Sequence, residues 1–184
     1  MSSYFTYIKN LADSDESESF VNHGKDDAIF TFSTIFNKAE SIIKMLSGNL
    51  KSGIADSKEY QESLNAFLQR NGRLQILIQD YNAEAQPEIF ELFRLNALLG
   101  RGEQIEIKTT KLCVRIDESE VHFCVADNKM YRIENDIEKF SAYGNFNNPV
   151  FATALADIFD KLFTDTTHTS PVLLQSKHSD IIIS

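Results

Sequence analysis

The side chains best suited to chemistry lie in two short stretches of the second half of the chain. The first reads Glu120-x-His122-x-x-x-x-Asp127, and the second, Gly144-Asn145-Phe146-Asn147, follows after 16 intervening residues. An imidazole can act as a base or a nucleophile, and an Asn amide can hold an oxyanion. A histidine on a strand can equally be a hydrogen-bonded structural residue. Both interpretations of His122 stay open from the sequence.

Other candidate sites are weaker. His168 and His178 lie in a polar C-terminal stretch and are expected to be solvated. Cys113 and Cys124 form no CxxC and have no histidine cluster nearby, so we expect no metal site and no disulfide. No phosphate-binding loop, dinucleotide fingerprint or nucleophile elbow occurs, and we expect no cofactor.

The apolar periodicity predicts one α/β domain. A helical stripe begins near residue 26, although residues 41–46 could be its end or a short buried strand. A capping box at Asp56 and Glu59 begins the next helix, and residues 74–78 form a strand. Pro87 opens another helix, alternation of period two from residue 104 predicts an antiparallel meander, and Asn148-Pro149 opens the last helix.

This order of elements resembles one half of a phospholipase D-like fold over residues 26–165. The resemblance implies a mixed sheet of about six or seven strands flanked by helices. Active members carry His-x-Lys-x-x-x-x-Asp followed by Gly-Ser-x-Asn. Here Glu120 stands for the His and His122 for the Lys, while Asp127 and Asn147 match. The resemblance therefore implies a degenerate, non-catalytic member. The one literal His-x-Lys, His23-Gly24-Lys25, has Phe30 where the Asp should fall and is not expected to be catalytic.

Composition and charge limit the partners. The chain has 184 residues, with 27 acidic against 18 basic side chains and a net charge of −9. Such a surface repels nucleic acid and anionic lipid unless its cations are gathered, and no gathering is visible. No apolar run is long enough to cross a membrane. We expect a cytoplasmic protein with a flexible arm over 1–25, a single domain over 26–165 and a polar tail over 166–184.

Three functions compete. The leading hypothesis is a non-catalytic module that acts through protein–protein assembly or ligand sensing. The second is a phosphodiesterase or nuclease with an altered site around His122 and Asn147, whose phosphate clamp only Lys111, Lys129 or Arg132 could supply. The third is an acidic accessory or inhibitor of a nucleic-acid enzyme. The resemblance also implies a homodimer, or pairing with a larger protein, through the strand at 121–125 and apolar residues near Phe146 and Phe151.

Overall fold

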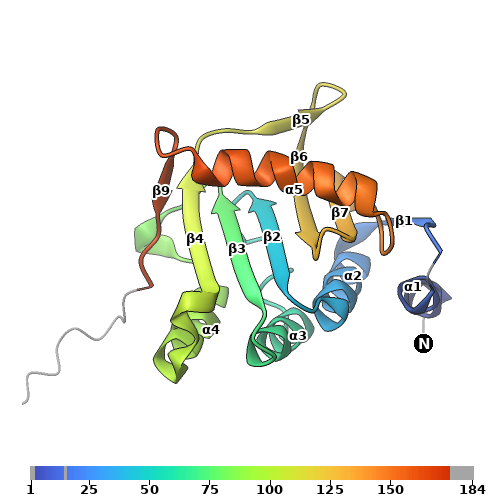
Figure 1. Cartoon of the computed structure of the whole chain (residues 1–184), viewed down its shortest axis with the longest axis horizontal. Helices are drawn as coiled ribbons and strands as arrows, with labels where there is room; N and C mark the ends of the chain where they lie inside the picture. Colours follow the sequence, from blue (N-terminus) through green and yellow to red (C-terminus); the bar gives the residue numbers. More distant parts are fainter. Residues whose placement is uncertain (1–2, 15, 175–184) are drawn as a thin grey trace, which may run out of the picture.

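The fold is built on one mixed β-sheet, which the computed structural model shows for residues 3–14 and 16–174 (Figure 1). Within these residues the strand order is β1-β8-β7-β6-β2-β3-β4-β9, and β5 pairs with β6 outside this path. Only the pairs β2–β3 and β3–β4 are parallel. The strands are β1 (Ser19–Asn22), β2 (Ile42–Ser47), β3 (Arg73–Ile78), β4 (Ile105–Thr110), β5 (Val114–Ile116), β6 (Ser119–Ala126), β7 (Met130–Asp136), β8 (Ser141–Asn145) and β9 (Thr169–Pro171).

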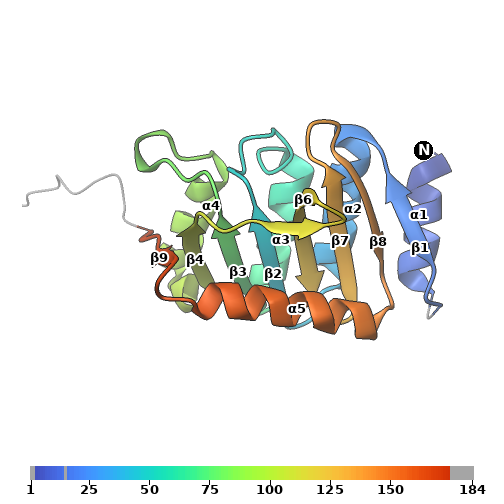
Figure 2. The same cartoon turned by 90° about the horizontal axis from the view of Figure 1, so that it is seen from above.

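Helices cover both faces of the sheet (Figures 1 and 2). One face carries α1 (Ser3–Asp13), α2 (Gly24–Lys38), α3 (Lys58–Gln69) and α4 (Ile89–Asn96), and a single helix, α5 (Pro149–Thr164), crosses the other. Short 3₁₀ turns span Ala83–Ala85 and Gly102–Gln104, and a π turn spans Ala97–Arg101. No helix among the described residues is long and apolar enough to cross a bilayer.

Each face of the sheet has its own apolar core. Phe36, Phe67, Phe90 and Phe93 pack from the helices onto one face, and α5 packs Leu155 and Phe159 onto the other. Side chains alternate between the two faces along each strand. In β6 the odd-numbered residues 121, 123 and 125 therefore meet α5, while the even-numbered ones face α2 and α3. This alternation decides where Glu120 and His122 lie.

Most elements follow the sequence pattern, with small shifts at their ends. Residues 41–46 belong to strand β2, not to the end of a helix. The cap of α3 is Ser57, whose hydroxyl accepts the Tyr60 N–H at 3.4 Å, so the cap predicted at Asp56 was wrong by one residue. The predicted cap of the last helix is confirmed, because the Asn148 side chain accepts the Phe151 N–H and Pro149 follows.

The prediction of a mixed α/β sheet is confirmed, but the sheet has nine strands where about six or seven were expected. The strands that the pattern did not show, β1, β8 and β9, have only three to five residues, too few for a clear period. The meander was also placed wrongly at its start. β4 pairs in parallel with β3, since alternation predicts a strand but not its neighbour.

The ends of the chain depart most from expectation. Residues 1–25 do not form a flexible arm where they are described: α1 buries Ile8 and Leu11, and β1 buries Phe20 and pairs with β8. The C-terminal stretch contributes β9 to the sheet edge, and residues 175–184 lie outside the described part of the chain. The spacing of Tyr4, Ile8 and Leu11 is compatible with a short helix, but the acidic run from Asp13 to Glu18 is typical of a solvated segment and therefore favoured a flexible arm.

Candidate functional site

The site begins on one face of β6. Glu120 and His122 are two residues apart, so both point to the α2–α3 side of the sheet. In the register, His122 lies opposite Glu134 of β7, and Cys124 lies opposite Arg132. Adjacent strands therefore place an imidazole, a carboxylate and a guanidinium together.

These side chains form a chain of hydrogen bonds across the sheet. His122 Nδ1 lies 3.2 Å from Glu134 Oε2, and Arg132 Nη2 donates to Glu134 Oε1 at 3.2 Å. On its other side Arg132 Nε donates to Asn22 Oδ1 at 3.0 Å. Arg132 also lies over the ring of Phe32, with 4.6 Å from its guanidinium carbon to the ring centre. The network fixes the orientation of His122.

Burial makes the charges in this network depend on one another. The Arg132 side chain is 2% exposed and that of Glu134 is 11% exposed. Burial alone would raise the pKa of Glu134, but the hydrogen bond from His122 and the charge of Arg132 outweigh it and lower that pKa. Burial has the opposite effect on a cation: it lowers the pKa of Arg132, while the charge of Glu134 and its hydrogen bond with Arg132 partly offset this decrease. The result is a carboxylate that is ionised at neutral pH.

A cleft runs beside this network at the carboxyl ends of β2 and β3. Its inner part has a volume of about 50 Å³ and joins apolar side chains to His122, Arg132 and Glu134. Its outer part, about 160 Å³, shares Ser47, His122 and Glu134 and adds Gly48 and Asp80. A volume of 10–15 Å³ holds one water molecule, so the inner part fits only a few non-hydrogen atoms. The site suits a small group.

Glu120 is an exposed residue that does not line the cleft. Its carboxylate accepts a hydrogen bond from Gln79 Nε2 at 3.1 Å, and the same amide nitrogen donates to the Leu112 carbonyl at 3.0 Å. Gln79 itself is buried at the end of β3. This arrangement ties the start of β6 to the loop after β4.

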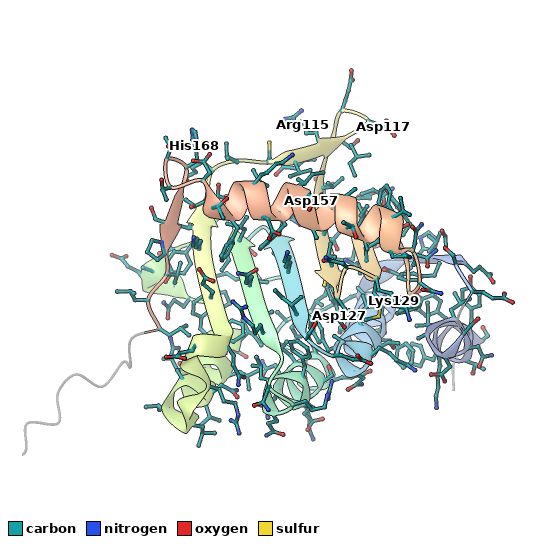
Figure 3. The ribbon with its side chains drawn as sticks, viewed as in Figure 1. Arg115, Asp117, Asp127, Lys129, Asp157 and His168 are labelled. Atoms are coloured by element: carbon teal, nitrogen blue, oxygen red, sulfur yellow. The ribbon has the colours of Figure 1, made fainter. Side chains whose placement is uncertain are left out.

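Asp127 lies at the other end of β6, far from His122. Figure 3 shows Asp127 and Lys129 at one end of the sheet, with Arg115 and Asp117 of the β5–β6 hairpin at the opposite end. The Asp127 carboxylate accepts the backbone N–H groups of Glu40, Ser41 and Ile42 at 2.7–2.9 Å. Burial alone would raise the pKa of Asp127, but these bonds lower it. Its role is to hold the start of β2.

Asn147 does not join His122 either, so the predicted site around these two residues was wrong. The β-strand register places Ala142 of β8 in the same row as Glu134 and His122. β8 runs from this row to Asn145, and the turn beyond it reaches the Asp127 end, where the Asn148 N–H donates to the Lys129 carbonyl at 3.0 Å. The Asn147 backbone N–H donates to Asn145 Oδ1 at 2.7 Å in this turn, which leads into α5. Spacing along the chain did not show which end of the sheet this segment reaches.

The remaining sequence candidates are scattered. Lys129 lies at the Asp127 end, and neither Lys129 nor Lys111 lines the cleft. His168 pairs with Asp165 at 2.7 Å in the turn before β9, while His178 lies outside the described residues. His23 Nδ1 lies 3.3 Å from Ser141 Oγ. The described residues contain no group of three or more His, Cys, Asp or Glu side chains that could hold a metal.

Solved structures share this architecture, although no model of a protein family and no curated protein matches the sequence. Nuc, a phospholipase D family member from Salmonella typhimurium, aligns with a TM-score of 0.59 and 14% identity over 85% of this chain and 99% of that one. The fold is phospholipase D-like. Phosphatidylserine synthase from Haemophilus influenzae aligns at 0.52 and 12% identity, over 91% of this chain and 45% of its own. At these identities the likeness shows the fold alone.

The sequence candidates did not include all members of the hydrogen-bonded network. Glu134 and Asn22 were absent from them, and Arg132 was predicted only as part of a phosphate clamp. One signal was present: Arg132 and Glu134 interrupt an apolar strand two residues apart, the spacing that puts both on one face. The register that joins them to His122 is visible only in the folded sheet.

Proposed function

We propose that this chain is a non-catalytic module on a phospholipase D-like fold that acts by sensing a small ligand in the His122 cleft and by assembly with another chain. The observation that carries the proposal is the separation of the four motif positions. Glu120 is bonded to Gln79, Asp127 holds the start of β2 and Asn147 lies in the turn before α5. A phosphodiester would find no group of residues to bind it.

The charges of the cleft support this proposal. Arg132 is the one Lys or Arg side chain among the described residues that line either part of the cleft. Its charge is matched by Glu134, and Asp80 adds a second carboxylate at the outer part. An anionic phosphate needs unpaired cations and donors. A phosphate in this cleft would instead lie near two carboxylates, which repel it.

Hydrolysis assays test the absence of catalysis. The full chain is offered bis-nitrophenyl phosphate, single-stranded DNA and duplex DNA. We expect no turnover above a contaminant level and the same trace in His122→Ala. One observation favours the alternative phosphodiesterase: a carboxylate orients the His122 imidazole, as in many enzymes. Turnover that disappears in His122→Ala would overturn our proposal in favour of that enzyme.

For the assembly we propose a homodimer. We also propose that the protein is cytoplasmic, and the exposed free thiol of Cys113 supports this location. The pairing edge expected at 121–125 was wrong, because β6 lies between β2 and β7 with its side chains mostly buried. Phe146 is buried too. The candidate surface is the outer side of α5, where Val150 is 83% exposed and Phe151 and Ile158 are each 38% exposed.

Sedimentation equilibrium tests the homodimer. We expect a species of twice 20.9 kDa in the wild type, and a shift to the monomer in Val150→Glu/Ile158→Glu. Gln69→Glu, at an exposed polar position of α3 on the other face of the sheet, is the control and should leave the dimer intact. A wild-type monomer at high concentration would remove the homodimer and leave pairing with a larger protein to be sought by pull-down.

A further inference from the structure

The polar groups that the outer part of the cleft leaves available include both hydrogen-bond acceptors and a donor. The second nitrogen of His122, the Asp80 carboxylate and the Ser47 hydroxyl can accept, and the Asn49 amide nitrogen can donate, because only Asn49 Oδ1 is hydrogen-bonded within the described part of the chain. No hydrogen bond from the side chain of Ser47 or Asp80 to another described residue is found, and His122 uses only Nδ1. A hydroxyl can donate or accept, but a carboxylate can only accept.

The pairing with Glu134 fixes the role of the free His122 nitrogen. Glu134 is ionised, so it accepts a hydrogen bond and Nδ1 must carry the proton of that bond. In the neutral imidazole the other nitrogen, Nε2, is then a lone-pair acceptor. Gly48 lies beside this edge of the ring: a Cβ built on Gly48 would be 3.1 Å from Cε1 and 3.4 Å from Nε2. Position 48 therefore suits a glycine, because the backbone comes close to this edge of the His122 ring.

The balance of charges in the cleft favours a ligand with a positive charge. Asp80 and Glu134 carry two negative charges against the single positive charge of Arg132. Glu134 and Arg132 compensate each other at 3.2 Å, so Asp80 is the uncompensated charge. Lys25, whose Nζ lies close to Gly53, is a neighbouring cation, but neither residue lines the cleft. A ligand group that donates hydrogen bonds and carries positive charge fits best.

The inner part of the cleft is suited to the rest of such a ligand. Its apolar lining comes from β2, the loop after β2, and the helices α2 and α3, and includes Phe32, Leu50, Ile54 and Tyr60. Its small volume admits a chain of a few carbons. Removing such a chain from water favours binding.

We propose that the cleft binds a small primary alkylamine, with the ammonium group between Asp80 and His122 Nε2 and the alkyl chain in the inner part. This inference rests on the ligand-sensing role proposed above and names its ligand class. A phosphate ligand would need an unpaired positive charge, whereas the unpaired charge of this cleft is the Asp80 carboxylate.

Three probes of equal chain length and different head groups test the inference. The full chain is titrated at pH 8 by calorimetry with n-butylamine, 1-butanol and butyrate. An alkylamine, like a lysine side chain, is protonated at this pH. We expect the amine to bind roughly tenfold more tightly than the alcohol and butyrate to show no saturable binding.

Substitutions then locate the site. Asp80→Asn should weaken amine binding about fivefold to tenfold, towards the alcohol value. Asp157→Asn removes an exposed carboxylate from α5 on the opposite face of the sheet and is the matched control (Figure 3). It should leave amine binding unchanged. Gly48→Val should weaken the binding of both the amine and the alcohol, because its side chain would displace the His122 ring, and unfolding curves of each variant establish that it is folded.

Each other outcome overturns the inference. Butyrate binding more tightly than the amine would show an anion site. Equal loss of amine binding in Asp80→Asn and Asp157→Asn would show a general charge effect, and no saturable amine binding would show that no amine site exists. None of these changes the hydrolysis result, whereas His122-dependent hydrolysis would overturn the proposed function itself.

Discussion

Two carboxylates beside β6 make different kinds of hydrogen bond: Asp127, which is half-buried, and Glu134 of β7, which is buried. At one end of β6 Asp127 accepts three consecutive backbone N–H groups, from Glu40 to Ile42. At the other end the partners of Glu134 are side chains, Arg132 and His122. Backbone donors keep their positions when the surrounding side chains change, whereas a side-chain network depends on every member.

This difference separates a structural end from an adaptable one. The Asp127 end ties β6 to the start of β2 through hydrogen bonds that both carboxylate oxygens accept. The His122 end keeps one ring nitrogen and a cleft available, at the carboxyl ends of parallel strands where open α/β sheets usually bind ligands. Substitutions at the two ends should therefore differ in size and in pH dependence.

The largest effect is expected from Arg132→Met. The substitution leaves Glu134 buried without its cation, and breaking a buried ion pair in this way costs about 3–5 kcal/mol of unfolding free energy. Urea denaturation monitored by circular dichroism measures the loss. Arg115→Met, at an exposed position of β5, is the control and should change stability by less than about 0.5 kcal/mol. Losses of similar size in both variants would remove the distinction between the network and the surface.

A smaller loss, about 2 kcal/mol, is expected from Asp127→Asn. The amide keeps the shape and one acceptor oxygen, but it loses the charge that strengthens three hydrogen bonds to the backbone. Asp117→Asn, in the β5–β6 turn, is the control for a change of charge alone and should be nearly neutral (Figure 3). A stable Asp127→Asn variant would show that the strand start needs no carboxylate.

The same variant has a defined pH dependence. Because the folded-state pKa of Asp127 is lowered, its contribution is complete above the unfolded-state pKa of about 3.9 and is lost as the pH falls through the folded-state value. The difference in unfolding free energy between wild type and Asp127→Asn should thus be constant from pH 5 to 7 and shrink below about pH 4. A difference that grows on acidification would mean that the pKa is raised instead.

Local patterns in the sequence predicted most of the helices and central strands. The apolar stripe of α5, its start at Asn148-Pro149 and the buried strand β3 could each be predicted from residues that are neighbours in the sequence. Strand partners were not predictable in the same way. β4 alternates like a meander strand but pairs in parallel with β3, because pairing depends on connections outside the strand.

The candidate site was predictable only in part, for the same reason. His122 and Glu120 were identified because they lie close together in the sequence. Arg132 and Glu134 reach the cleft from β7, and Asn22 of β1 supports them through a hydrogen bond with Arg132 that spans 110 positions of the chain. The prediction for Asn147 was wrong for a related reason. This residue matches a motif position in the sequence, but it follows the end of β8 that lies away from His122.

The smallest effect, about 0.5–1 kcal/mol, is expected from His122→Gln. Glu134 keeps its ion pair with Arg132, and the Gln amide can still donate one hydrogen bond, so only part of one interaction is lost. A double-mutant cycle with Glu134→Gln should give a coupling energy of about 1 kcal/mol, whereas the pair His122 and Asp127 should be additive, since they share no partner. Strong coupling between His122 and Asp127 would contradict the independence of the two ends. A coupling energy near zero for His122 and Asp127, together with a measurable one for His122 and Glu134, would mean that side chains of the cleft can change without affecting the start of β2.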